Sequence, residues 1–169
     1  MEKKFLIISN QNTLCYKDVF PLLRDGEMWL GVQRHSMDFL MNGEIVSAQA
    51  CWFTNLPNLK YKKPFKLIKH YSPSDYPKFD NYNAIEVSRS KDIPMDYTGV
   101  MGVPISFIFK YYPKQFEIIT IACGNSWANY PETLKELGFD PSIKYGGGLG
   151  AAVLGGKGKY QRLLIRKIT

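Results

Sequence analysis

Lysines gather in one stretch of this 169-residue sequence, with aromatic residues among them. The run consists of Lys60, Lys62, Lys63, Lys66 and Lys69, with Tyr61 and Phe65 interspersed. Ammonium groups on flexible stems bind phosphates as point charges, so such a run fits the backbone of a nucleic acid. A solvated strand face would have the same composition. On these residues alone both interpretations stay open.

A second group of polar residues has side chains that fit the edges of bases. Asn81, Asn83 and Arg89 follow the lysine run along the chain. An amide can pair with adenine and a guanidinium with guanine in the major groove. These three residues are therefore our candidates for reading DNA sequence, with a turn at Asn81 as the alternative.

A third polar group, Asn10, Gln11 and Asn12, follows a short apolar run. Residues 4–9 read as a buried parallel strand, and α/β sheets bind ligands where their parallel strands end. The group would then lie near a cofactor or target-base pocket. A polar helix cap formed by Asn12 and Thr13 explains it equally well.

The sequence nominates no catalytic residue and no metal ligand set. His35 and His70 have no nucleophile near them in sequence, and the three cysteines are widely spaced without a CxxC motif. Structural zinc usually requires four closely spaced Cys or His ligands. Free thiols of a cytosolic protein are the better interpretation.

Charge favours an anionic partner. The chain carries a formal net charge of +7 with a pI of about 9.2. Residues 56–91 hold eight basic and three acidic residues, and residues 143–169 hold six basic residues and no acid. A tract with seven glycines lies in the second block, between 145 and 159. It reads either as a flexible surface loop or as a loop that approaches phosphates.

The order of predicted elements indicates an α/β fold that changes character after residue 56. Residues 4–9 are followed by a predicted helix over 13–24 and by strands over 28–32 and 48–53. This pair should be antiparallel, with a loop containing Asn42-Gly43 between its strands. We expect residues 1–56 to form the edge of a methyltransferase-like doubly wound sheet.

Residues 57–169 are predicted to form a mostly β, loop-rich subdomain that recognises DNA. Its strands are expected over 65–69, 84–88, 105–109, 116–122 and 162–168. One helix is expected over 130–137, with Gly138 capping its end. No stretch resembles a signal peptide or a membrane span, so we expect a soluble, cytoplasmic protein.

Several segments resemble the EcoRI-type adenine-specific DNA methyltransferases, in the same order along the chain. Most specific is the block from Tyr76 to Val87, YPKFDNYNAIEV, which continues as IPMDYTGVMGVPISF from Ile93 to Phe107. The opening KKFLIISNQN, then MWLG, WFTNL, GNSW and the closing YQRLLIR add to it. The resemblance covers nearly the whole chain.

This resemblance implies an S-adenosylmethionine-dependent enzyme that modifies adenine N6 in double-stranded DNA for a restriction-modification system. Such enzymes grip the flipped base with an Asn-Pro-Pro-Phe loop. Here no two prolines are adjacent. The family's glycine-containing cofactor loop also lies upstream of that motif. The chain thus resembles the C-terminal, DNA-binding half, inactive alone, with the N-terminal catalytic half as an implied partner.

An alternative from another class is a free-standing nucleic-acid-binding or assembly module without methylation activity. An upstream reading frame encoding a glycine loop and an Asn-Pro-Pro-Phe motif would favour the methyltransferase interpretation. An enzyme with an unrelated small site is a weaker alternative, because no constellation of residues supports one.

Overall fold

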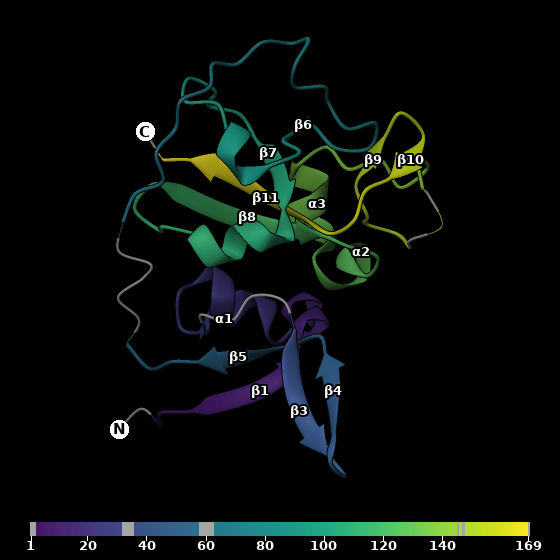
Figure 1. Cartoon of the computed structure of the whole chain (residues 1–169). Coiled ribbons are helices and arrows are strands. Elements are labelled where there is room, and N and C mark those ends of the chain that lie inside the picture. Colours follow the sequence, from purple (N-terminus) through teal and green to yellow (C-terminus); the bar gives the residue numbers. More distant parts are fainter. Residues whose placement is uncertain (1–2, 32–35, 58–62, 145, 147, 169) are drawn as a thin grey trace. The chain divides into compact units, whose positions relative to one another are not determined.

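The structure is a computed structural model that describes all residues except 1–2, 32–35, 58–62, 145, 147 and 169. The chain divides into two compact units, Met1–Tyr61 and Lys62–Thr169. The predicted boundary, between residues 56 and 57, lies close to this division. Together the units form a mixed α/β structure with several small sheets and few helices (Figure 1).

Unit 1 contains a three-stranded sheet in the order β1-β5-β2. Its strands are β1 (Leu6–Asn10), β5 (Ala50–Thr54) and β2 (Trp29–Leu30). Both β1 and β2 run antiparallel to β5, which confirms the antiparallel pair predicted from the sequence. The prediction that residues 4–9 form a buried parallel strand was wrong for this chain. β1 pairs with β5 along one edge only, and Leu6, Ile7 and Ile8 are exposed.

The helix predicted over 13–24 is broken into two short pieces. The 3-10 helix η1 covers Gln11–Cys15, and α1 covers Phe20–Arg24. Pro21 lies in the first turn of α1. Proline lacks an amide hydrogen and clashes with the preceding turn, so a helix can start at this position but cannot continue through it.

A two-stranded hairpin takes the place of the loop predicted around Asn42-Gly43. Strands β3 (Met37–Met41) and β4 (Glu44–Ala48) pair antiparallel over their full length. Asn42 and Gly43 form the turn with φ values of 54° and 86°. Asn-Gly is the sequence that such two-residue turns favour, so the turn itself was readable from the sequence.

Unit 2 is built on a four-stranded sheet in the order β6-β7-β11-β8. The strands are β6 (Ile85–Glu86), β7 (Met101–Pro104), β11 (Arg162–Lys167) and β8 (Phe116–Ala122). The strands predicted over 116–122 and 162–168 are confirmed, and that over 84–88 is shorter than predicted. An ion pair between buried Glu86 and partly buried Arg162 joins two of these strands, with Arg162 Nη2 lying 2.9 Å from Glu86 Oε1.

Two predicted strands of this unit were wrong. Residues 105–109 lie in the 3-10 helix η4 (Ile105–Lys110), since a short apolar run does not distinguish a strand from a buried helical segment. Residues 65–69 form no strand, and only Lys69 makes an isolated bridge, to Pro94. The Gln115 side chain forms hydrogen bonds with both the amide and the carbonyl of Phe65, which a neighbouring strand would otherwise bind.

Three further helical segments accompany the sheet, namely η3 (Ser90–Asp92), α2 (Ser126–Asn129) and α3 (Pro131–Glu136). The last of these confirms the helix predicted over 130–137. Gly138 follows it with φ 66°, and its amide donates to the Lys135 carbonyl. This is the capping role expected of a glycine in the left-handed region.

The middle of the glycine tract is packed into the interior of unit 2. Ala151, Ala152 and Val153 are buried, and a small hairpin follows, formed by β9 (Val153–Leu154) and β10 (Lys157–Gly158). A Cβ added to Gly150 would lie 2.7 Å from the Trp127 amide nitrogen. The surface-loop interpretation is therefore wrong for residues 150–153, whereas Gly155, Gly156 and Lys157 are exposed.

In the part of the chain that the structure describes, no helix combines the length and apolar character needed to cross a membrane.

Candidate nucleic-acid interface

The start of unit 2 is an extended segment, residues 63–69, that a single side chain holds in place. Gln115 accepts a hydrogen bond from the Phe65 amide (2.6 Å) and donates one to the Phe65 carbonyl (2.7 Å). The Lys110 ammonium lies 5.5 Å from the centre of the Phe65 ring. These contacts bring the lysines of residues 63–69 close to the end of η4.

The other end of the segment is fixed to the C-terminal strand. The Met95 amide donates to the Lys69 carbonyl (2.8 Å), and the Lys167 ammonium donates to the Met95 carbonyl. The Ile168 amide donates in turn to the Gln115 carbonyl (2.9 Å). Residues 63–69 therefore run past the end of β11 (Figure 1).

Together these contacts gather lysines from four parts of unit 2, a set that we call the lysine strip. It comprises Lys63, Lys66, Lys69, Lys110, Lys114 and Lys167. The first five are exposed and Lys167 is half-buried. Within the described residues, none of the six forms an ion pair with a carboxylate. Two predicted members of the lysine run, Lys60 and Lys62, lie outside the described residues.

Two acids lie close in sequence to members of the strip, namely Asp96 beside Met95 and Glu117 near Gln115. Asp96 accepts hydrogen bonds from His70 Nδ1 (2.9 Å) and from the Tyr71 amide (2.8 Å). The His70 bond is the larger cause of a lowered pKa for Asp96, and the Tyr71 amide adds to it. Glu117 lies 3.8 Å from Arg166. Six lysines against these two carboxylates leave this region with a net positive charge.

Half of the strip was not anticipated from sequence. Lys110, Lys114 and Lys167 lie far from Lys63 along the chain, and only the fold brings them to the same region. Gln115, which positions residues 63–69, carried no recognisable signal in the sequence. A long polar side chain beside a strand start is common and does not reveal which backbone it will bind.

The Asn81 side-chain amide is buried and bonded to the backbone, so it is not available to bind a DNA base. It is 1% exposed. Its Nδ2 donates to the Ala151 carbonyl (2.8 Å), and its Oδ1 accepts from the Val153 amide (2.8 Å). Asn81 therefore ties the end of the glycine tract to the loop before β6.

The other two candidates for base reading are on the surface. Asn83 is exposed, and its backbone amide donates to the Leu137 carbonyl. The Arg89 side chain is 67% exposed, and its Nε lies 2.6 Å from Asp92 Oδ2. That contact engages Nε, and most of the side chain is exposed to solvent. The structure does not bring Asn81, Asn83 and Arg89 together as one reading surface.

The polar group at the end of β1 forms a cap. Asn10 Oδ1 accepts from the Asn12 amide (2.8 Å) at the start of η1. The Gln11 amide donates to the Gln49 carbonyl. The capping residue is thus Asn10, rather than Asn12 or Thr13 as the sequence had suggested. The described residues of this group do not by themselves form a cradle that fits S-adenosylmethionine.

Comparisons with known proteins agree with one another. The family model described as adenine-specific methyltransferase EcoRI matches residues 1–168. The type II methyltransferase M.EcoRI of Escherichia coli is 43% identical over 144 residues, which cover 73% of this chain and 44% of that protein. The type II methyltransferase M.MgeORF184P of Mycoplasma genitalium is 31% identical over 187 residues, with 98% and 57% covered.

A third relative, the type II methyltransferase M.MpnI of Mycoplasma pneumoniae, is 30% identical over a region of the same length. The chain spans about half the length of the curated relatives it matches. No solved structure gives a significant match.

Proposed function

The chain belongs to the EcoRI family of adenine-specific methyltransferases, and from that membership we propose that it is the DNA-binding portion of such an enzyme. The complete activity would be transfer of a methyl group from S-adenosylmethionine to adenine N6 of duplex DNA in a restriction-modification system. The lysine strip is the observation that carries the DNA-binding proposal.

The strip suits a phosphate backbone for three reasons. Its lysines are mostly exposed, they come from segments held together by hydrogen bonds, and they outnumber the two neighbouring acids, Asp96 and Glu117. Each phosphate neutralised by a lysine releases a counterion, so affinity should fall steeply with salt. Such contacts set the register of the protein on DNA without reading sequence.

Sequence reading is assigned to Arg89 and Asn83, the two exposed candidates. The terminal nitrogens of Arg89 have the fork geometry that pairs with guanine. Asn81 supports them indirectly, because it holds the loop in which Asn83 lies against the glycine tract.

The sheet of unit 1 supports a place at the edge of a larger doubly wound sheet. β1 and β2 are parallel to each other because both are antiparallel to β5, and η1 and α1 form the crossover between them. The second edge of β1 has no partner strand among the described residues, and its side chains are apolar on both faces. That is the pattern of an interior strand. The partner that we propose for this edge is the catalytic portion of a family-length protein.

S-adenosylmethionine is the cofactor that the family implies, and it supplies the methyl group when bound. Because Asn10 caps η1 through the Asn12 amide, we assign no step of methyl transfer to these residues. Their place at the end of β1 would put them beside a pocket completed by the partner portion.

Fluorescence anisotropy with labelled duplex DNA at several salt concentrations tests the DNA-binding proposal. If about four to six phosphates are contacted, log affinity should fall with log salt at a slope of about −3.6 to −5.4. The double variant Lys63→Ala, Lys66→Ala should reduce the slope by about 1.8. A matched control, Lys17→Ala in unit 1, should leave it unchanged. Absence of binding at low salt would overturn the proposal.

A further inference from the structure

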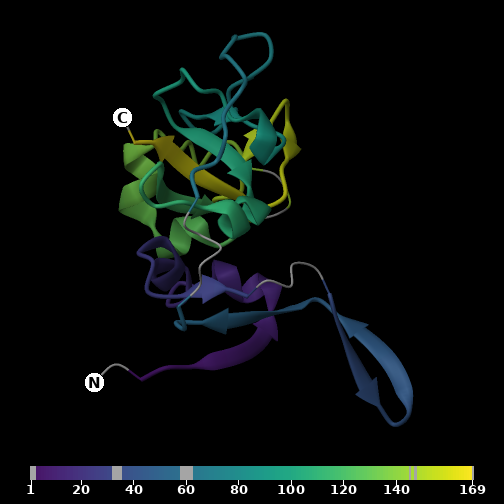
Figure 2. The ribbon, with the colours of Figure 1, turned by 60° about the vertical axis from the view of Figure 1, so that its left-hand side comes forward.

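The strand directions in unit 2 bring the ends of three strands and the start of a fourth to one edge of the sheet. β6 runs parallel to β7, and both β7 and β8 run antiparallel to β11. The ends of β6, β7 and β8 therefore lie at the same edge as the start of β11. Lys167, a member of the lysine strip, lies at the opposite end of β11. Figure 2 shows β11 as the yellow strand that crosses unit 2 toward the C-terminus.

Planar polar and aromatic side chains gather at this edge. Arg89 follows β6 by three residues, Asn125 follows β8 by three, and Tyr160 and Gln161 directly precede β11. We call these four residues the reading edge. Arg89 and Asn125 are exposed, Tyr160 is 67% exposed and Gln161 is partly exposed. Within the described residues, the side-chain amides of Asn125 and Gln161 and the Tyr160 hydroxyl form no hydrogen bond.

A charged network inside the sheet fixes the backbone just before β11. The Glu86 carboxylate is 3% exposed and accepts hydrogen bonds from Arg162 Nε (3.2 Å) and Nη2 (2.9 Å). Arg162 Nη1 donates to the Tyr160 carbonyl (2.9 Å), and the Ile105 amide donates to the Gln161 carbonyl (3.2 Å). Replacing such an ion pair by apolar residues is often neutral or stabilising, so stability alone gives little reason for it. Its local effect is to hold Tyr160 and Gln161 at the edge.

The other two members of the reading edge are fixed by hydrogen bonds close to them in sequence. Asp92 Oδ2 accepts from Arg89 Nε (2.6 Å), and the Asp92 amide donates to the Arg89 carbonyl (2.8 Å). The fully buried Ser126 hydroxyl accepts from the Cys123 amide (2.8 Å), which fixes the turn that carries Asn125. Because the backbone is held at all four residues, less conformational entropy is lost when their side chains bind.

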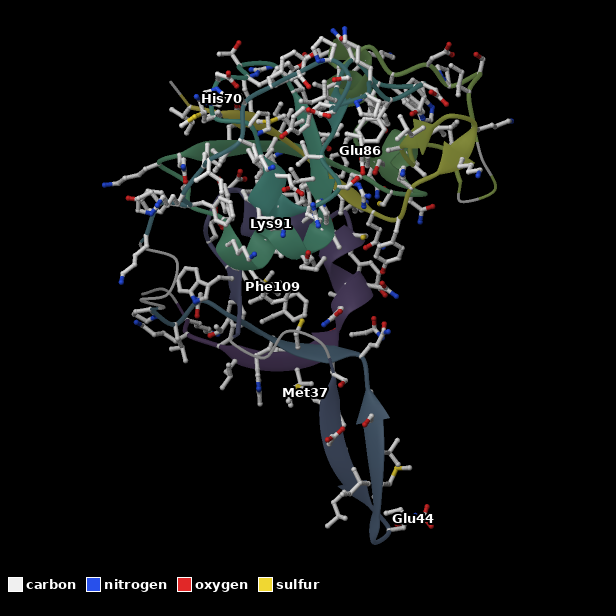
Figure 3. The ribbon with its side chains drawn as sticks, turned by 45° about the horizontal axis from the view of Figure 1, so that its top comes forward. Met37, Glu44, His70, Glu86, Lys91 and Phe109 are labelled. Atoms are coloured by element: carbon white, nitrogen blue, oxygen red, sulfur yellow. The ribbon has the colours of Figure 1, made fainter. Side chains whose placement is uncertain are left out.

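The chemistry of the reading edge fits the bases of duplex DNA. Guanidinium and carboxamide groups present the paired donors and acceptors that match base edges in the major groove. Lys91 is exposed and Lys159 is partly exposed beside these residues, and the Asp92 carboxylate is paired with Arg89. Figure 3 labels Lys91 and Glu86, which lie on the segment from β6 to η3 that leads into this edge. The local charge is therefore positive, as contact with DNA requires.

We propose that the reading edge contacts base pairs in the major groove, with Arg89 on guanine, Asn125 and Gln161 on adenine, and Tyr160 against a thymine methyl group. The proposal rests on the DNA binding proposed above and adds the residues that select a sequence. Neighbouring strands lie about 4.8 Å apart, so the edge measures about 14 Å from β6 to β8. That length corresponds to about four base pairs at 3.4 Å each.

Photocrosslinking tests where the bases lie. 5-Bromodeoxyuridine carries bromine in place of the thymine methyl group, so ultraviolet light links it to side chains that touch this position in the major groove. In a complex of the wild-type chain with a bromodeoxyuridine duplex, peptide mass spectrometry should find Tyr160 crosslinked about tenfold more than Tyr16. Tyr16 is the matched control, a tyrosine of unit 1 that is 60% exposed.

Equal crosslinking of the two tyrosines, or crosslinks confined to other residues, would refute the reading edge. Fluorescence anisotropy on the same samples separates this outcome from failure of DNA binding. A complex that forms without a crosslink to Tyr160 refutes the reading edge alone. If no complex forms, both the reading edge and the proposed DNA binding are refuted.

Selection from a randomised duplex pool tests which residues choose the sequence. The wild-type chain should enrich a motif of about four base pairs. Gln161→Ala and Asn125→Ala should each lose about tenfold of the preference at one position, because a bidentate contact separates the right base from the wrong one. Affinity for the unselected pool should stay within about twofold, since neither change removes a charge. Thermal unfolding should also match wild type, because both residues lie at the surface.

Gln49→Ala, at an exposed glutamine of unit 1, is the matched control and should keep the wild-type motif. A wild-type chain that binds the pool without enriching any motif would contradict the proposal. Gln161→Ala and Asn125→Ala variants that both keep the full motif would contradict it as well, and a protein partner would then be the remaining candidate for this edge.

Discussion

Asn81 is a buried residue whose amide bonds the backbone, so it stabilises the fold and is not accessible to a DNA base. Its side chain closes two hydrogen bonds to the backbone at the end of the glycine tract, and both are shielded from water. Removing one side of a buried hydrogen bond leaves the other group without a partner, which costs the desolvation of that group. Asn81 is therefore a structural residue, which fixes the shape of its loop.

Replacing Asn81 with alanine should lower the free energy of unfolding by about 2–4 kcal/mol, because the Ala151 carbonyl and the Val153 amide lose their partner. Urea unfolding followed by tryptophan fluorescence measures the change. Asn83→Ala, at an exposed position in the same loop, should change stability by less than about 0.5 kcal/mol. An Asn81→Ala protein with wild-type stability and altered sequence preference would support direct base reading instead.

The three cysteine thiols differ in their surroundings. Burial raises the pKa of Cys51 to about 11, and Cys51 is fully buried. Since the thiolate is the reactive form, little of it exists in the folded protein at pH 8. We expect Ellman's reagent to label Cys15, which is partly exposed, well before Cys51 and Cys123. Rapid labelling of all three thiols in native buffer would contradict this; full labelling in urea is the control.

In the glycine tract, some glycines are required by close packing and others only by their backbone conformation. Gly150 has φ 116° and lies against the backbone of the β8–α2 connection, so both its conformation and its surroundings exclude a side chain. Gly155 has φ 57° in the β9–β10 turn, and a Cβ there would meet nothing within 4 Å. Only the first glycine is required by packing.

Gly150→Ala should therefore destabilise unit 2 by about 3 kcal/mol or more, because left-handed strain adds to a clash with backbone that cannot move aside. Gly155→Ala should cost about 1–2 kcal/mol, for its backbone conformation alone. Thermal unfolding of the two variants side by side makes the comparison. Equal losses would mean that the tract is not docked in solution.

At the scale of the whole molecule, a sheet edge and a lysine strip occupy separate units. Unit 1 contains β1, whose second edge has no partner strand among the described residues. Unit 2 contains the lysine strip and the candidate base-reading residues Asn83 and Arg89. This division fits a chain that spans about half the length of its relatives. DNA binding and methyl transfer should therefore be separable in experiments.

The purified 169-residue chain is expected to bind duplex DNA without methylating it, because it contains no Asn-Pro-Pro-Phe loop to hold a flipped adenine. A labelled-methyl transfer assay on plasmid DNA, run beside anisotropy on the same preparation, measures both properties. A purified family-length relative serves as the positive control for transfer. Methyl incorporation above background by this chain alone would refute the expectation.

From the sequence, the family, the two longest strands of unit 2 and several turns of the chain could be predicted. Residues 116–122 and 162–168 alternate or run apolar over enough length to be strands in any context. Asn42-Gly43 and Gly138 adopt left-handed backbone conformations that few other residues accept. Pro21 likewise indicated where a helix could not continue. Each of these features depends on the conformational preferences of a few neighbouring residues, so a short stretch of sequence is enough to predict it.

Which polar residues are accessible, and which lysines lie near one another, depends on the tertiary structure. Asn81 and Asn83 are the same residue type two positions apart, yet one is buried and the other exposed. Lys110, Lys114 and Lys167 join Lys63 only because Gln115 and Met95 tie residues 63–69 to the ends of η4 and β11. Such pairings depend on contacts between residues far apart in the chain, and no window of sequence contains both partners.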